Sequence, residues 1–262
     1  MGGGHATGEE GYYVPGNPLA RSTDLEAFAW PDPHDPNLLV EAARTIARNR
    51  DEYFILPNFG FALFERAWSL RGFEQIFLDL GRDQDFVAAL LDRIVDIQLV
   101  LIERLIELGV DGGYFGDDYG AQKNLLFSPA LWRKLIKPRL ARLFAPFSER
   151  GLPVVMHSDG QIQKILPDLV EIGLTTLNPV QPEVLDHAWL NENFEAHLSF
   201  YGGISTQSVL PYGTADEVKA AIAACKGALA PEGTGLLIGP SHRLMSDIPL
   251  ANVEAMLAAF QD

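Results

Sequence analysis

Short apolar runs alternate with longer amphipathic stretches from about residue 50 to the end of the chain. The stretches between the runs have helical periodicity, and the longest of them fills most of residues 61–109. Strands this apolar, separated by helices, are typical of a parallel sheet that is covered on both faces. The six predicted strands are residues 53–59, 112–118, 153–159, 175–181, 198–204 and 235–242.

Three helix ends can be predicted from local sequence. Gly109 follows the long amphipathic stretch as a helix C-terminus commonly requires. Ser128 precedes Pro129, which predicts an N-cap followed by proline in the first helical position. Thr214 and Glu217 are spaced as a capping box, so a helix is expected to begin there.

Polar side chains gather at the predicted C-terminal ends of the strands. A barrel brings all its strand ends to one mouth, whereas an open doubly wound sheet gathers ligands at a switch point. No glycine-rich phosphate fingerprint follows the first strand, so we expect an α/β fold of the (β/α)8 TIM-barrel type. The polar residues are Asn58, Asp117, Asp118, His157, Asp159, Asn178, Gln181, Ser205, Gln207 and His242.

The strand count falls short of a closed barrel, which has eight strands. We expect residues 51–262 to form the barrel domain and residues 1–50, rich in Gly, Pro and acidic residues, to be an irregular segment packed on it. The run GYYV at residues 11–14 is a weak extra strand candidate. Either the barrel is shortened at its N-terminus, or another segment or subunit closes it, and an unclosed edge would favour a homo-oligomer.

Composition narrows the classes of partner and compartment. The 262 residues are 47% hydrophobic, contain no apolar run of membrane-spanning length, and begin without the features of a signal peptide, so a cytoplasmic protein is expected. The net charge is −15 without any cluster of Lys and Arg, which argues against nucleic acid and membrane partners and favours a small-molecule substrate. Cys225 is the only cysteine, so a multi-thiolate metal site is excluded.

The run VVMHSDG places chemistry at the end of a buried strand. Residues two apart on a strand face the same way, so His157 and Asp159 both point into the predicted mouth. His242 lies at the corresponding end of the last strand, and together the three would form a metal site with open coordination positions. The alternative is a histidine bonded to backbone, with Asp159 capping a helix that starts near Gln161.

Other strand-end residues complete the candidate site. Asp117 and Asp118 are candidate catalytic acid/base or orienting carboxylates, although one of them would alternatively satisfy loop backbone. The other histidines, His5, His34, His187 and His197, are expected to be solvated or structural. The candidate substrate-binding residues are Asn58, Asn178, Gln181, Tyr201, Gln207 and Arg243.

Several motifs in consistent order resemble a known superfamily. They are GDDYGAQKNLLFSPALWRKLIKPRLARLF, VVMHSDGQIQKILPDLVEIGLTTLNPVQP, YGGISTQSVLPYGTADEV and LLIGPSHRLMSDIPLANVEAM. From about residue 11 onward the chain is similar to the uroporphyrinogen decarboxylase superfamily, and to its methyltransferase-like branch more than to the decarboxylases of haem synthesis. The resemblance implies a (β/α)8 barrel, usually with more N-terminal barrel sequence.

The resemblance also implies a metal site. Corrinoid-dependent methyltransferases of this superfamily hold zinc with a His-x-Cys pair and a later cysteine, and a methylated corrinoid on a partner protein donates the methyl group to a small acceptor. His157 matches the histidine, Asp159 takes the place of the first cysteine, and His242 falls where the second is expected. Imidazole and carboxylate ligands suit Fe²⁺ or Mn²⁺ as well as Zn²⁺. The sequence does not name the methyl donor or acceptor: a small thiol, tetrahydrofolate and a methoxylated compound are all candidates.

Two further hypotheses stay open beside a metal-dependent methyltransferase. One is a decarboxylase in which the Asp117–Asp118 pair stabilises a protonated pyrrole-like intermediate without metal. The resemblance implies an arginine-bearing N-terminal motif for that activity, and this sequence has none. The other is a non-catalytic barrel that binds a small ligand or a corrinoid protein, since the family's cysteines are absent.

Overall fold

The six predicted strands are all present in the computed structural model, which describes residues 16–261. They form one parallel sheet within that part of the chain. The strands are β1 (Asn58–Gly60), β2 (Gly113–Gly116), β3 (Val154–His157), β4 (Thr176–Asn178), β5 (Ser199–Ile204) and β6 (Leu236–Pro240).

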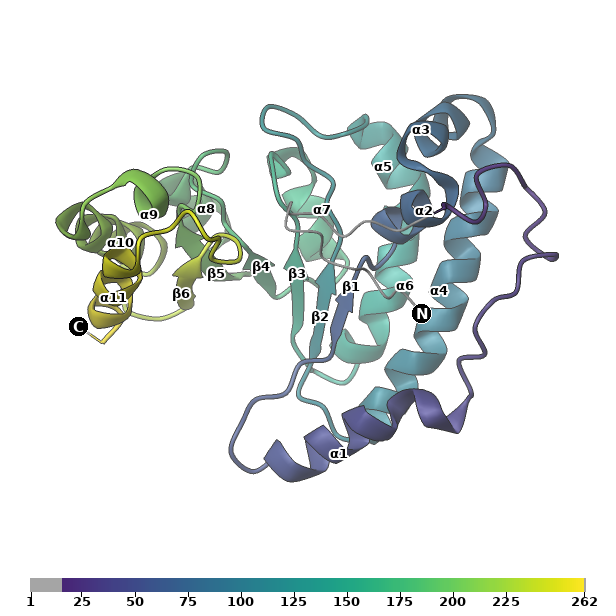
Figure 1. Ribbon diagram of the computed structural model, residues 1–262, viewed down its shortest axis with the longest axis horizontal. Helices are drawn as coiled ribbons and strands as arrows, with labels where there is room; N and C mark the ends of the chain where they lie inside the picture. The colour runs from purple at the N-terminus through teal and green to yellow at the C-terminus, as the bar shows by residue number, and fades with distance from the viewer. Residues whose placement is uncertain (1–15, 262) are drawn as a thin grey trace.

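Helices fill the connections between the strands, as the periodicity predicts (Figure 1). Two short 3-10 helices, at Pro36–Leu39 and Gln163–Ile165, accompany them. The α-helices are α1 (Val40–Asn49), α2 (Phe64–Arg71), α3 (Phe73–Arg82), α4 (Gln84–Glu107), α5 (Pro129–Leu135), α6 (Lys137–Ser148), α7 (Leu166–Glu171), α8 (His187–Phe194), α9 (Val209–Tyr212), α10 (Ala215–Leu229) and α11 (Leu250–Ala259).

The strand order identifies the sheet as barrel-type. The strands neighbour one another in the order β1-β2-β3-β4-β5-β6, without the reversal that defines a doubly wound sheet. Among the described residues β1 and β6 are the two edges and do not pair with each other, so the barrel is not closed. The α/β class is therefore confirmed, and the sheet is compatible with a (β/α)8 barrel that this part of the chain leaves incomplete.

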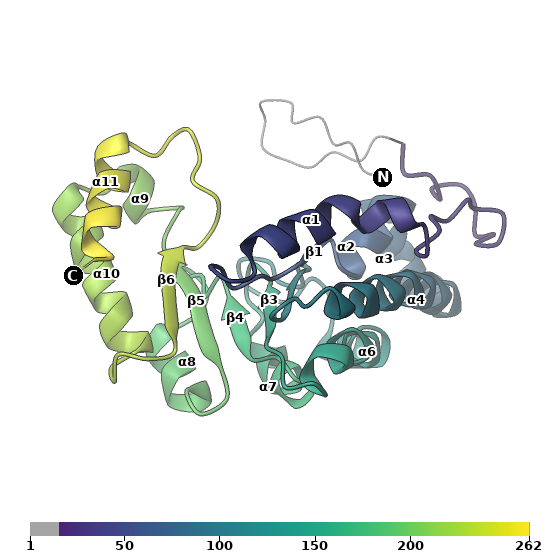
Figure 2. The ribbon, with the colours of Figure 1, turned by 90° about the horizontal axis from the view of Figure 1, so that it is seen from below.

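The two faces of the sheet have different chemistry. Because successive side chains on a strand point to opposite faces, strand register sorts the residues into an outer and an inner row. The inner row at the strand ends holds Gly116, His157 and Asn178 in register. The outer row packs against the helices that lie along the outer side of the strands (Figure 2). This outer row consists of Phe59, Phe115, Met156, Leu177 and Phe200.

The predicted helix ends are confirmed. The α4 helix ends at Glu107, and Gly109 follows in the left-handed conformation at φ 84°. Ser128 Oγ accepts a hydrogen bond from the Leu131 N–H at 3.2 Å, and both halves of the Thr214 capping box are formed. These signals are local, and helix capping within four residues needs no tertiary information.

The N-terminal segment differs from the prediction. Residues 36–49 are helical, so the description of residues 1–50 as irregular is wrong for this part. The α1 helix is amphipathic, and it buries Ile46 in the core. Arg50, its C-cap, donates to the Leu108 carbonyl at 2.9 Å, which ties α1 to the end of α4 (Figure 1). The strand candidate at residues 11–14 lies outside the described residues.

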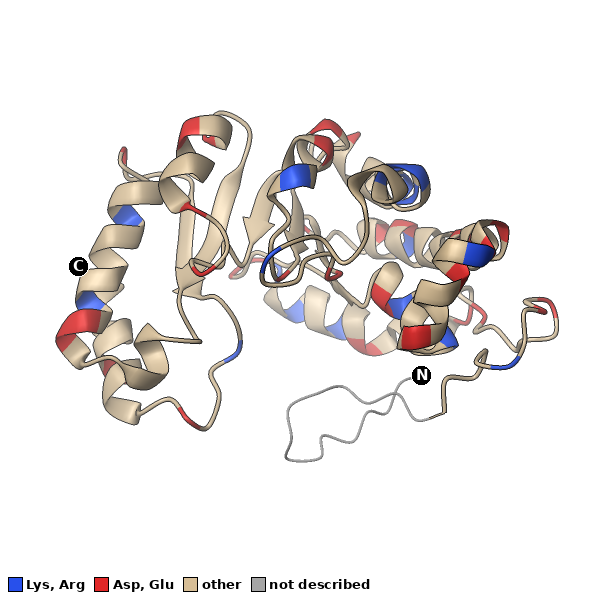
Figure 3. Cartoon of the chain, turned by 90° about the horizontal axis from the view of Figure 1, so that it is seen from above, with Lys and Arg blue, Asp and Glu red and all other residues tan. Residues whose placement is uncertain are grey.

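Charged side chains are distributed over the outer helices. In the cartoon of Figure 3, the positions of Lys and Arg are interleaved with those of Asp and Glu along the helices. None of the helices in residues 16–261 has both the length and the apolar character needed to span a membrane.

Candidate functional site

The candidate site begins where β3 ends. His157 is the last residue of β3 and lies in register between Gly116 on β2 and Asn178 on β4. Asp159 follows two residues later on the same chain, on a turn that Gly160 closes at φ 81°. The period-two prediction therefore places the imidazole and the carboxylate together at the inner face.

Asn178 fixes the orientation of the His157 ring. The Asn178 Nδ2 group donates to the Tyr201 carbonyl at 3.1 Å, and a carbonyl only accepts, so Oδ1 must face the opposite way. That oxygen accepts from the Tyr114 hydroxyl at 2.9 Å and from His157 Nδ1 at 2.6 Å. His157 therefore carries its proton on Nδ1 and presents the lone pair of Nε2 to the site.

Asp159 lies between two imidazoles that come from opposite parts of the sheet. Its Oδ2 is 3.8 Å from His157 Nε2 and 4.0 Å from His242 Nε2, and the two rings are 6.3 Å apart between centroids. These separations are too long for hydrogen bonds. Ligand atoms that share a zinc ion at about 2.1 Å lie roughly 3.4 Å apart, so a small contraction would suit a shared cation.

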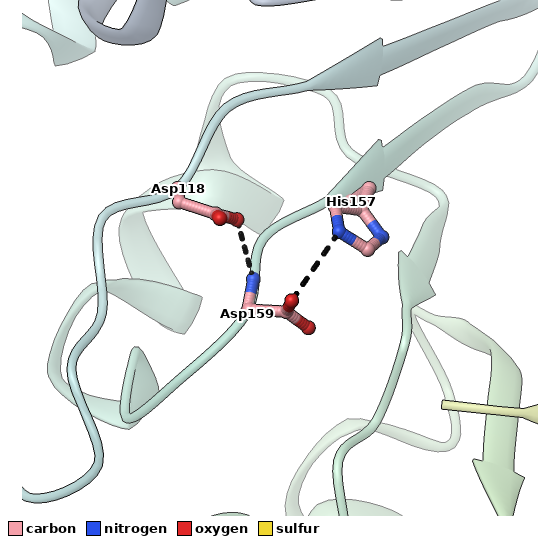
Figure 4. Close-up of side chains that lie close together, drawn as sticks. All are labelled: Asp118, His157 and Asp159. Atoms are coloured by element: carbon pink, nitrogen blue, oxygen red, sulfur yellow. Dashed lines mark hydrogen bonds and ion pairs between the residues drawn. The ribbon is translucent and has the colours of Figure 1, made fainter. Parts of the chain in front are cut away.

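Asp118 joins this cluster from the end of β2. Its Oδ1 accepts the backbone N–H of Asp159 at 2.8 Å (Figure 4). Ligand atoms of Asp118, His157 and Asp159 all lie within 4.8 Å of one another. One imidazole nitrogen and two carboxylate oxygens, with His242 beside them, are a donor set that fits Zn²⁺, Fe²⁺ or Mn²⁺.

The pKa of Asp159 is subject to opposing effects from burial and from the neighbouring charged and titratable groups. Burial raises the pKa of the Asp159 carboxyl, and the nearby Asp118 adds to this increase. His157 and His242 act in the opposite direction, because their electrostatic interaction with Asp159 favours the carboxylate form. Two carboxylates this close repel each other, and a cation between them would relieve that repulsion.

Asp117, predicted as a catalytic residue, is occupied by hydrogen bonds to the backbone at the start of α2. It is fully buried, and its two oxygens accept the backbone N–H groups of Phe64 and Glu65, each at 2.7 Å. The Tyr119 hydroxyl donates to the same carboxylate. Burial raises the pKa of Asp117 to about 6, although these hydrogen bonds oppose the increase. The α2 helix lacks an N-cap side chain of its own, so Asp117 caps it from another strand.

Glu65 is a member of the cluster that the sequence analysis missed. It lies in the first turn of α2 and is partly buried. Its pKa rises to about 9 because of burial and the nearby carboxylates Asp117, Asp118 and Asp159, against a hydrogen bond from the Asp118 backbone. Its place in the sequence, just after the true end of β1, is the signal that would have found it.

Comparison with known proteins identifies the family. The family model for uroporphyrinogen decarboxylase (URO-D) matches residues 1–262. The chain belongs to the uroporphyrinogen decarboxylase family. No curated protein matches the chain. Among solved structures, a methyltransferase from Methanosarcina mazei is similar with a TM-score of 0.66 and 22% identity, over 96% of this chain and 68% of the other. The superfamily resemblance is thus confirmed, and the neighbour supports the fold.

Gln181 is buried beside the turn after β3, whereas Asn58 lies at a different level of its strand from the one predicted. Gln181 is buried, and its Oε1 accepts the Gly160 N–H at 3.1 Å, while Nε2 has no hydrogen-bond partner within the described residues. Asn58 begins β1 instead of ending it, because the strand starts five residues later than predicted. Asn58 therefore lies two residues before the end of β1, in register with Tyr114 on β2, and not at the strand end itself.

The remaining predicted residues surround the mouth of this URO-D family sheet. Tyr201 lies in the middle of β5 and is 36% exposed, and its carbonyl holds Asn178. Gln207 and Arg243 are exposed in the loops that follow β5 and β6. Asp159 does not cap the helix after it, because Gln161 Oε1 accepts the Gln163 N–H at 3.0 Å in that place.

Proposed function

We propose that this URO-D family member is a metal-dependent methyltransferase that moves a methyl group between a corrinoid on a partner protein and a small acceptor of the thiol or tetrahydrofolate type. The observation that carries the proposal is the convergence of His157, Asp159, Asp118 and His242 at the strand ends. The methyltransferase of the same fold from Methanosarcina mazei supports it.

Within this proposal the metal is Zn²⁺, held by His157 and Asp159, with Asp118 and His242 on either side of Asp159. The ion supplies Lewis acidity, which lowers the pKa of a bound thiol or water. The residues of the chain provide the preorganisation. Asn178 keeps the lone pair of His157 Nε2 directed at the site, and Asp118 holds the peptide of Asp159 in place.

Substrate binding is assigned to polar groups around the same mouth. The Nε2 group of Gln181 is a buried donor without a partner in residues 16–261, and such a group costs about 1–3 kcal/mol unless a ligand accepts from it. Tyr201, Gln207 and Arg243 come from the neighbouring strand and loops and would contact the acceptor. Asn178 was predicted to bind substrate. We assign it instead to the orientation of His157, since its side chain already has three protein partners.

The test is metal content by elemental analysis of protein purified without added metal. The wild type is expected to hold close to one zinc per chain and the His157→Ala variant almost none. His34→Ala is the matched control, because His34 is exposed in the N-terminal segment and its substitution should leave metal content unchanged. The same three proteins are then assayed for methyl transfer from methylcobalamin to a small thiol. Retention of zinc and transfer in His157→Ala would refute the proposal.

Decarboxylation of uroporphyrinogen, the activity after which the family is named, is the second candidate function. Its support is the family-model match over residues 1–262. An octacarboxylate such as uroporphyrinogen would meet Asp118, Asp159 and Glu65 at the mouth, and burying it there without cations is costly. Turnover of uroporphyrinogen by metal-free protein would favour this candidate over methyl transfer.

A further inference from the structure

The turn after β4, residues 178–181, carries two side chains that line the candidate site. Asn178, the last residue of β4, orients the ring of His157 through a contact of 2.6 Å. Gln181, three residues later, accepts the N–H of Gly160 at 3.1 Å, on the turn that follows β3. The backbone conformation of this β4 turn therefore sets the directions of both side chains.

The β4 turn is strained at Val180. Its φ is 45°, in the left-handed region, and the residue is fully buried. The left-handed region is unfavourable for a β-branched side chain, which crowds the neighbouring backbone there. A strained conformation of this kind persists only where the surrounding contacts hold it. The contacts made by the turn backbone are therefore the place to look for groups that support the site.

Hydrogen bonds from two neighbouring elements hold the carbonyl groups of the β4 turn. The N–H of Gly203 on β5 donates to the Pro179 carbonyl at 3.0 Å. The Nε2 atom of His187 lies 2.8 Å from the Val180 carbonyl, and because a carbonyl only accepts, this nitrogen carries the proton. His187 is the first residue of α8, and the side chain of Asp186 caps that helix and fixes its start. A side chain on α8 is thus bonded directly to the strained residue.

Packing alone does not explain a histidine at this position. The ring of His187 is partly buried and lies in the wall of an open hollow of about 550 Å³, which residues of α8 and α10 line. The α10 residues on the hollow are small, and they include Ala221, Ala224 and Cys225. Another side chain of similar size would fit there without crowding. The property that sets His187 apart is the N–H group that it donates to the β4 turn.

We propose that His187 is a positioning residue of the candidate metal site and that it acts through the backbone of the β4 turn. Its hydrogen bond keeps Val180 in the left-handed conformation, and this conformation directs Asn178 to His157 and Gln181 to the turn after β3. The sequence predicted only a solvated or structural role for this histidine. The inference rests on the proposed metal-dependent function for its consequence, since His187 is itself no candidate ligand.

Four variants separate this role from a general effect on folding. His187→Leu roughly keeps the size of the side chain but removes the donor, whereas His187→Gln restores an N–H group at the reach of the imidazole Nε2. His187→Asn keeps an amide that is too short to reach the carbonyl, and it replaces the leucine variant if that one does not fold. His197→Leu is the matched control, because His197 is exposed beyond the end of α8. Urea unfolding in the presence of a chelator shows whether each variant is folded.

Two measurements on metal-free protein report on the turn itself. Amide hydrogen exchange at Gly160 and Gly203 follows the hydrogen bonds at the two ends of the turn, and the ¹⁵N chemical shifts of the His157 ring report the tautomer that Asn178 fixes. His187→Leu should lose about tenfold of the amide protection at both glycines, as expected for one hydrogen bond. It should also show a mixture of His157 tautomers. His187→Gln and His197→Leu should match the wild type.

Titration with Co²⁺ reports the consequence for the site. His187→Leu should bind Co²⁺ roughly three- to thirtyfold more weakly than the wild type, with a changed visible spectrum, although no candidate ligand has been removed. His187→Gln and His197→Leu should again match the wild type in affinity and spectrum. A residue with a purely structural role would lower the stability of the fold without changing the spectrum.

The outcomes distinguish this inference from the proposed function. If the wild type binds Co²⁺ and His187→Leu keeps the amide protection, the tautomer and the spectrum, the positioning role is overturned and the metal site stands. If the wild type binds no Co²⁺, the proposed function fails, and amide exchange with the His157 tautomer decides whether His187 holds the turn. A loss in His187→Leu that His187→Gln does not restore would also overturn the role.

Discussion

The ring of His157 is held by Asn178, whose Oδ1 lies 2.6 Å from His157 Nδ1. The amide cannot turn over, because its Nδ2 group already donates to the Tyr201 carbonyl. One neighbouring strand therefore sets both the tautomer and the rotation of the imidazole. Such partners of a metal-binding histidine raise its basicity and reduce the entropy lost on binding.

Removal of this partner should weaken metal binding while every candidate ligand stays in place. We expect Asn178→Ala to lower Co²⁺ or Zn²⁺ affinity about 10- to 100-fold, measured by competition with a chromophoric chelator. Tyr114→Phe removes one hydrogen bond to Asn178 but keeps the bond to His157, so a smaller loss is expected. Asn193→Ala, in the exposed face of α8, is the control. Wild-type affinity in Asn178→Ala would show that the ring needs no such support.

Asp117 should matter for stability more than for the chemistry of the site. Asp117→Asn leaves one acceptor oxygen where two now receive the N–H groups of Phe64 and Glu65 and the Tyr119 hydroxyl. We expect a loss of about 2–4 kcal/mol in the free energy of unfolding, measured with urea on metal-free protein. Asp83→Asn is the control, because Asp83 caps α4 from an exposed position where Asn is an equally good cap. Equal effects of the two substitutions would contradict the buried-cap role.

The raised pKa of Glu65 predicts a specific pH dependence. Burial and the neighbouring carboxylates raise the pKa of Glu65 to about 9, from an ordinary value of 4.5, so the folded protein holds this proton up to about pH 9. The contribution of Glu65 to stability is therefore complete below about pH 4.5 and is lost as the pH rises towards 9, by at most about 1.4 kcal/mol per pH unit. Because glutamine does not titrate, Glu65→Gln should gain stability relative to the wild type between pH 5 and pH 8.

The measurement is urea unfolding of both proteins across that range in the presence of a chelator. Glu74→Gln, at an exposed first-turn position, should run parallel to the wild type. A constant difference between wild type and Glu65→Gln from pH 5 to pH 8 would show that Glu65 is ionised in the native state.

The residues also show which parts of the molecule a single sequence can predict. His157 and Asp159 were placed together because strand periodicity acts over two residues, and the caps at Ser128 and Thr214 act over three. Asp117 caps a helix that begins 53 residues earlier in the chain, and no local pattern encodes that contact.

The error at the first strand had a larger consequence. The apolar run at residues 53–59 predicted a strand that ends beside Asn58, but only residues 58–60 pair fully with β2. Pro57 lacks an N–H group, and the paired strand begins directly after it. The predicted strand end therefore pointed to Asn58 as a site residue, whereas Glu65 lies beyond the true end of β1, in the first turn of α2.

Gly202 offers a test of how tightly the strand ends are packed behind the site. Its φ is 110°, and a Cβ at this position would lie 2.2 Å from the Pro179 carbonyl oxygen, on the residue that follows Asn178. Because this neighbour is backbone, Gly202→Ala should cost about 3 kcal/mol or more in the free energy of unfolding. Gly227→Ala, in α10 with no atom within 4 Å of the added methyl group, should instead stabilise by about 0.5–1 kcal/mol.

Urea unfolding compares both alanine variants with the wild type, and metal affinity is measured on the folded fraction. A displaced Pro179 would move Asn178 and with it the ring of His157, so Gly202→Ala should lower metal affinity as well as stability. Gly227→Ala lies on the outer helical layer and should change stability alone. If Gly202→Ala unfolds at the wild-type urea concentration, then β5 does not approach the Pro179 backbone as closely as the structure requires, and the packing that supports the His157–Asn178 contact would need revision.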